Sequence, residues 1–174
     1  MLNFIPLIQH SLIYGVILGG SVCALFLLGA YFNPEVMFRG YPPDIKAKYG
    51  QISEKGQRHQ KLLGIPVAIV MFGSLIAAIV QLPQVIGGEP GFMAVFMCVT
   101  IMMLTLNIID LVINDWLIFV ILHPRFVVLP GTEGLAGYSD YGFHFQQFLK
   151  GAFGSLISGF VIAGIVTFIY AVAA

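Results

Sequence analysis

The chain has 174 residues and is strongly apolar, with 59% hydrophobic and 9% charged residues and a formal net charge of zero. Soluble domains are roughly 45–50% apolar and about 25% charged, so this composition lies far outside their range. The mean hydropathy is correspondingly high, at +0.95. This composition excludes a water-soluble globular domain. Its length leaves room for one membrane domain and no separate soluble module. Because the charges balance, we expect no nucleic-acid partner.

Four long apolar segments predict four transmembrane helices, because about 20 apolar residues cross the hydrocarbon core of a bilayer. We place these spans at about residues 8–31, 62–82, 92–122 and 141–172. The longer loops between them cover residues 33–61 and 123–140. Pro66 falls in the first turn of the second span, where its missing N–H does no harm. The expected fold is all-α, a single polytopic four-helix transmembrane domain over residues 1–174.

The distribution of charge predicts the orientation of these spans. All eight Lys and Arg residues occupy two stretches, 39–61 and 125–150, and four spans put both stretches on one side. Basic loops remain in the cytoplasm under the positive-inside rule. We therefore predict two cytoplasmic loops and both termini outside the cytoplasm.

Small residues at four-residue intervals indicate where helices pack closely. They are Gly15 and Gly19 in the first span, and Gly151, Ser155, Gly159 and Ala163 in the fourth. Contact within one chain and contact between copies both fit this pattern. The expected partners are therefore the lipid bilayer and either a homo-oligomer or a membrane complex.

The third span carries a polar face formed by Asn107, Asp110, Asn114 and Asp115, which fall within an arc of roughly 140°. A charge at mid-bilayer costs about 2.5–3.5 kcal/mol, so we expect the acids near the cytoplasmic boundary. Residues 92–122 make a helix of about 46 Å, longer than a hydrocarbon core of roughly 30 Å. The pattern predicts a polar pocket that opens to the cytosol. The alternative is a set of interhelical hydrogen bonds with an Asp at headgroup level.

The loop after this span adds polar side chains to the same rim. Pro124 ends the helix and Pro130-Gly131 forces a turn. The further candidate ligand-binding residues of the loop and of the next span are His123, Arg125, Glu133, His144 and Gln147. Imidazole is a common metal ligand and titrates near neutrality. The HExxH and CxxC motifs are absent, so we predict no metal site and name His123, His144 and Asp115 as the residues that would hold one. The sequence assigns no catalytic residue and no cofactor.

The first loop has six basic residues against Glu35, Asp44 and Glu54. This excess of positive charge favours anionic headgroups or a phosphate-bearing ligand. The alternative is a topology signal with no binding role.

Three short runs resemble a segment of small bacterial integral membrane proteins of uncharacterised activity. They are DWLIF at 115–119, PRFV at 124–127 and PGTEG at 130–134. The resemblance implies an integral protein of the bacterial cytoplasmic (inner) membrane and brings no function with it.

The sequence thus predicts an integral membrane protein whose cytoplasm-facing polar pocket binds a small or lipidic ligand. Asp110 and Asp115 would supply negative potential there, and Arg125 would anchor an anionic group. One alternative is an interfacial enzyme that modifies a lipid or prenyl substrate, with His144 or Asp115 as general base. Another is a structural or assembly subunit of a membrane complex.

Overall fold

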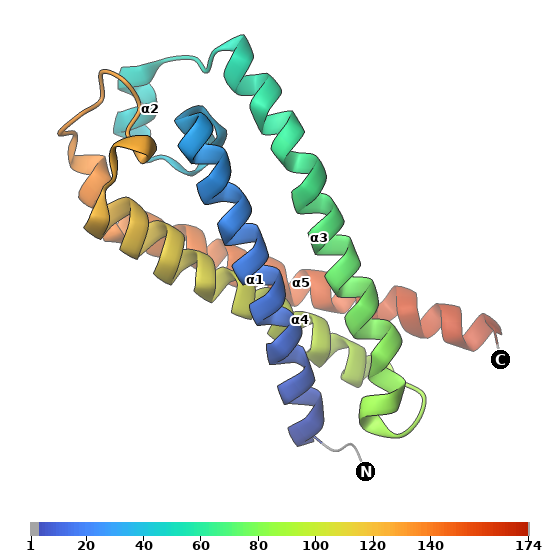
Figure 1. The fold of residues 1–174 in the computed structure, drawn as a ribbon. Coiled ribbons are helices and arrows are strands. Elements are labelled where there is room, and N and C mark those ends of the chain that lie inside the picture. The colour runs from blue at the N-terminus through green and yellow to red at the C-terminus, as the bar shows by residue number, and fades with distance from the viewer. Residues whose placement is uncertain (1–3, 174) are drawn as a thin grey trace.

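A computed structural model describes residues 4–173 of the chain, and this part is 86% helical and contains no strand. Four helices are long and apolar enough to cross a membrane, which suggests an integral membrane protein. They are α1 (Phe4–Phe32), α3 (Glu54–Ile86), a continuous helix formed by α4 (Phe92–Ile109) and η2 (Asp110–Leu122), and α5 (Tyr141–Ala173). The predicted all-α fold with four long apolar helices is confirmed (Figure 1).

The helices form a row rather than a closed square. The extensive contacts are those of α1 with α3, α1 with α4, and α4 with α5. The order across the row is therefore α3, α1, α4, α5, and α4 with α1 forms its middle (Figure 1). Large apolar side chains on α3 and α5, such as Ile69, Phe72 and Phe160, are exposed. Lipid chains are the solvent that suits such faces.

The second long helix begins earlier than the sequence pattern indicates. Ser53 accepts a hydrogen bond from the Gly56 N–H at 3.0 Å and caps α3 before Glu54, as N-cap serines do. Pro66 consequently lies well inside α3 rather than in its first turn, which corrects our prediction. At the other end Gly87, at φ +74°, closes the helix in the left-handed conformation, which glycine adopts without strain.

The small residues of α1 and α5 are the places where these helices approach α4. A Cβ atom at Gly15 would lie 2.6 Å from the Thr105 Cβ, and one at Gly151 would collide with the Asn107 side chain. Gly19, Ser155 and Gly159 also meet α4, and Ala163 is buried in the core. In this chain both small-residue faces therefore serve packing between its own helices.

The C-terminal part of the third span is a π-helix, which the sequence pattern did not indicate. It runs as η2 from Asp110 to Leu122 and ends at His123, whose backbone has φ 45°. The His123 N–H donates to the Ile118 carbonyl at 2.9 Å, which is the i to i−5 spacing of this helix type. Such segments are rare and often mark functional sites.

The two connections at this end fold together into one unit, which we call the cap (residues 33–53 and 123–140; Figure 1). Its short helices are η1 (Pro34–Gly40), α2 (Pro43–Tyr49), η3 (Arg125–Val127) and η4 (Ala136–Ser139). Tyr41, which is fully buried, donates to the Val127 carbonyl at 2.7 Å. The Asp44 carboxylate accepts from the Gly137 N–H at 2.8 Å. Both contacts join the first connection to the second.

The α1–α4 contact predicts a difference between two glycines of the same helix. Gly15→Ala is expected to lower the free energy of unfolding by about 1–3 kcal/mol, because the new methyl group overpacks against Thr105. A Cβ at Gly20 meets nothing within 4 Å, so Gly20→Ala should leave stability unchanged or raise it by up to about 1 kcal/mol. Thermal unfolding in detergent, followed by circular dichroism, measures both. Equal stability of the two variants would contradict the packing.

Candidate functional site

The polar side chains of the third span contact two neighbouring helices, α1 and α5. Asn114 donates from Nδ2 to Asp110 Oδ1 at 2.7 Å and accepts from the Cys23 thiol at 2.9 Å. Asn114 is buried, and Cys23 belongs to α1. Asp110 and Asn114 thus belong to the contact with α1, through Cys23.

Asn107 serves the contact with α5. Its Nδ2 donates to the Met103 carbonyl at 2.8 Å and to Ser155 Oγ at 3.1 Å. The amide also fills the space that a side chain at Gly151 would need. The Asn107 NH2 group therefore has two acceptors within the protein, and the role of the side chain is helix packing.

Asp115 and His144 form an acid–imidazole pair between η2 and α5. Asp115 Oδ1 lies 3.0 Å from His144 Nδ1, and the two side chains are 22% and 3% exposed. A carboxylate accepts from an imidazole N–H, so Nδ1 carries a proton and the other ring nitrogen, Nε2, has a free lone pair in the neutral ring. The ring packs edge-on against Phe119, at 5.0 Å between centroids.

Two polar nitrogens at this contact are buried without a hydrogen-bond partner. One is His144 Nε2, and the other is Trp116 Nε1. The Trp116 indole lies edge-on to Tyr141, at 5.9 Å, on the first turn of α5. A buried polar group without a partner costs about 1–3 kcal/mol, and each such group in a native protein calls for an explanation. We call Asp115, Trp116 and His144 the His144 site.

The other sequence candidates are exposed or have partners of their own. Arg125, Glu133 and Gln147 are exposed, and the Glu133 carboxylate accepts from the Gly131 N–H at 3.2 Å. His123 Nδ1 pairs with the Phe119 carbonyl at 3.0 Å, and its ring packs on Tyr138. Over residues 4–173, no three His, Cys, Asp or Glu side chains gather closely enough to hold a metal ion.

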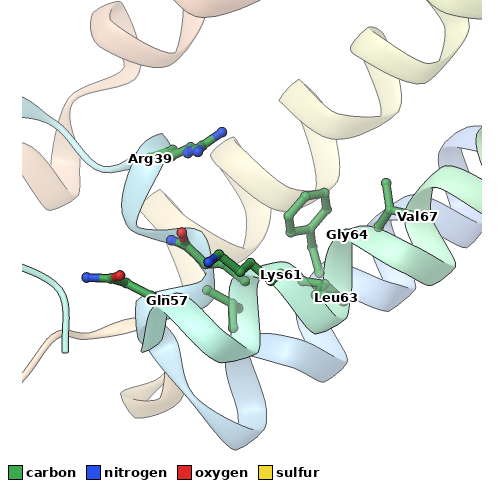
Figure 2. A pocket seen from close by; sticks show the side chains of 9 residues that line it. Arg39, Gln57, Lys61, Leu63, Gly64 and Val67 are labelled. Atoms are coloured by element: carbon green, nitrogen blue, oxygen red, sulfur yellow. The ribbon is translucent and has the colours of Figure 1, made fainter. Parts of the chain in front are cut away.

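A hollow of about 490 Å³ lies between α1, η1 and α3, at a place that the sequence analysis did not identify. Its lining residues are Phe26, Val36, Arg39, Gln57, Gln60, Lys61, Leu63, Gly64 and Val67. Figure 2 shows Arg39, Gln57 and Lys61 at one end and Val67 at the other. We call it the α1–α3 hollow. A second hollow of about 470 Å³ shares Val36 and Leu63 with it and is mainly apolar.

The buried carboxylate of Glu35 holds one wall of the α1–α3 hollow in place. It accepts from the Tyr49 hydroxyl at 2.7 Å, from the Ser53 N–H at 2.8 Å and from the Ser53 hydroxyl at 2.5 Å. Gly56 packs directly against it, where a Cβ atom would collide with the carboxylate. These contacts tie η1, which carries Arg39, to α2 and to the start of α3.

The hydrogen bonds at Glu35 determine its ionisation. Burial by itself raises the pKa of this carboxyl, but the donors from Ser53, Tyr49 and Asn33 together hold the pKa below its ordinary value of 4.5. Burial and the bond to Glu35 raise the pKa of Tyr49 to about 12. The pair is therefore an ionised acceptor and a protonated donor at neutral pH.

Comparison of the chain with protein-family models, with curated proteins and with solved structures found no significant match. The function is therefore argued from the geometry of the His144 site and of the α1–α3 hollow.

The Glu35 contacts predict a stability difference that depends on pH. Glu35→Gln is expected to lower the free energy of unfolding by about 2 kcal/mol at neutral pH, because hydrogen bonds to a charged acceptor are lost. A carboxyl with a lowered folded-state pKa stabilises fully above its ordinary pKa, and this contribution disappears as the pH falls through the folded-state value. The difference between wild type and variant should therefore close well below pH 4.5.

Thermal unfolding at neutral and at acidic pH measures this difference. Glu54→Gln is the matched control, because Glu54 is exposed at the start of α3 and its helix-dipole contribution is at most about 1 kcal/mol. A Glu35→Gln protein as stable as Glu54→Gln at neutral pH would refute the role of the buried carboxylate.

Proposed function

We propose that this integral membrane protein binds a small or lipidic ligand at the His144 site, with the cap on the cytoplasmic side of a bacterial inner membrane. The observation that carries the proposal is His144 itself. This histidine is almost fully buried, paired with Asp115 on one nitrogen and without a partner on the other.

The free groups of the site specify what the ligand would carry. With Asp115 accepting from Nδ1–H, His144 Nε2 is a hydrogen-bond acceptor, and its complement is an O–H or N–H group. Trp116 Nε1 can only donate, and its complement is an oxygen. A ligand that carries hydroxyl or amide groups offers both kinds of partner. Phe119 adds an apolar, aromatic wall, as small-molecule sites generally have.

The π-helix η2 supplies the means of entry in this proposal. Both Asp115 and Trp116 belong to η2, and Asp115 is the partly exposed member of the pair. π-helical segments are rare and frequently occur at functional sites. A small adjustment of η2 against α5 would open Nε2 to a ligand that arrives along Asp115.

The charge distribution supports the cytoplasmic orientation of the cap. Seven of the eight Lys and Arg residues lie in the cap or within the first turns of α3, and the eighth is Lys150 in α5. The Gly87–Gly91 turn at the opposite end carries only Glu89. This asymmetry is what the positive-inside rule predicts for a cytoplasmic cap.

The Asp115–His144 pair also favours a second candidate, an interfacial enzyme that uses Nε2 as a general base. A carboxylate on Nδ1 fixes the tautomer and stabilises the imidazolium that forms when Nε2 takes a proton. The assembly-subunit alternative has less support, because the small-residue faces of α1 and α5 are used within the chain.

The binding proposal predicts which variants lose their bound molecule. His144→Gln and Asp115→Asn are expected to retain at least tenfold less of at least one small molecule, because each removes one member of the pair. Gln147→Ala, an exposed change one turn further along α5, should retain the wild-type amount. The measurement is mass spectrometry of molecules extracted from the protein purified in mild detergent.

Thermal unfolding of the same samples shows whether each variant is folded. Identical extracts from folded wild type, His144→Gln and Asp115→Asn would refute the site. An enzyme is distinguished by turnover: incubation with vesicles of bacterial lipid should then yield a new product with wild type and none with His144→Gln.

A further inference from the structure

We propose that the α1–α3 hollow binds one anionic phospholipid, with the phosphate between Arg39 and Lys61 and an acyl chain along Phe26, Leu63 and Val67. This is a second site, separate from the His144 site in its residues and in its place at the other end of the row of helices. Its occupant is identified by the shape and charge of the hollow.

The polar end of the hollow carries two cations from different elements. Arg39 belongs to η1 and Lys61 to α3, and both side chains are exposed. Over residues 4–173, the single ion pair is that of Asp115 with His144, so neither cation has an acidic partner there. Gln57, which is also exposed, lines the same hollow. An Arg and a Lys that line one hollow without a paired carboxylate suit a phosphate group.

The acids of the first connection do not neutralise these cations. Glu35 is occupied by donors from Asn33, Tyr49 and Ser53, and Asp44 accepts from the Gly137 N–H. Glu54 lines a different hollow, with Lys55 and Arg58. The basic excess of this segment therefore remains available to an anion, and each Lys or Arg near an anionic lipid surface contributes about 1 kcal/mol.

The other end of the hollow is apolar. Phe26 of α1 and Val67 of α3 line it, and Leu63 and Val36 separate it from the second, mainly apolar hollow. Gly64 contributes no side chain, and a Cβ there would meet nothing within 4 Å. Lys61 and Val67 are six residues apart, so about 9 Å of helix separates the cation from the apolar floor.

The combination of a cationic end and an apolar end favours a phospholipid over a soluble phosphate compound. A soluble anion would use the two cations and leave the apolar floor uncovered, whereas a phospholipid covers both ends at once. The hollow lies at the cap end of α3, whose exposed face further along is apolar. Two cations next to an apolar helix face suit the boundary between the headgroup and chain regions of a bilayer.

Native mass spectrometry of the full chain in detergent, titrated with phosphatidylglycerol or with phosphatidylcholine, tests this site. Wild type is expected to bind one phosphatidylglycerol more tightly than phosphatidylcholine. The double variant Arg39→Gln/Lys61→Gln should bind phosphatidylglycerol about tenfold more weakly or worse. The control Lys48→Gln/Lys55→Gln removes the same charge from the same segment outside the hollow and should bind as wild type does.

A third variant, Gly64→Leu, fills the hollow without removing charge and should also lose the bound lipid. Because its Cβ enters open space, the helix is expected to fold normally, and thermal unfolding checks this. His144→Gln should still bind phosphatidylglycerol, because the two sites share no residue. A negative result for one proposed site therefore does not refute the other. Equal weakening in the two charge variants, equal affinity for both lipids, or undiminished binding by Gly64→Leu would overturn the proposal.

Discussion

The buried carboxylate of Glu35 is the interaction on which the cap depends. A carboxylate removed from water must be hydrogen-bonded, and this one is served by side chains and backbone that come from α1's end, α2 and the start of α3. These bonds join η1 to α2 and α3, and η1 carries Arg39, which lines the α1–α3 hollow. The first connection is consequently a folded structure rather than a flexible loop.

The cap also joins the two sites that we propose. On one side its η1 forms the wall of the α1–α3 hollow. On the other side its aromatic core, with Tyr41 and Tyr138, continues to Phe119 of η2, and Phe119 packs against His144. A lipid in the α1–α3 hollow and a ligand at the His144 site would therefore both lie against residues that pack on the cap. Packed side chains of the cap and η2 therefore connect α3 with α5.

Part of this architecture can be predicted from the sequence, and the physical origin of each feature explains whether it can. The helices are predictable because membrane length sets a run of about 20 apolar residues. Asp115 and His144 were named because helical periodicity places them at one rim. The α1–α3 hollow was not predicted, since Arg39 and Lys61 meet only through tertiary contacts around Glu35. The Cys23–Asn114 bond joins residues 91 positions apart, and the π-helix η2 has no Pro or Gly to indicate it.

The central claim is that the four helices cross a bilayer and leave the cap in the cytoplasm. Labelling with a membrane-impermeant maleimide tests it most directly, using Lys48→Cys in α2 and Glu89→Cys in the opposite turn, both at exposed positions. The native Cys23 and Cys98 are buried and serve as the unlabelled background. We predict that Lys48→Cys reacts only in inside-out vesicles and Glu89→Cys only in spheroplasts. The reverse pattern, or reaction of both from one side, would contradict the account.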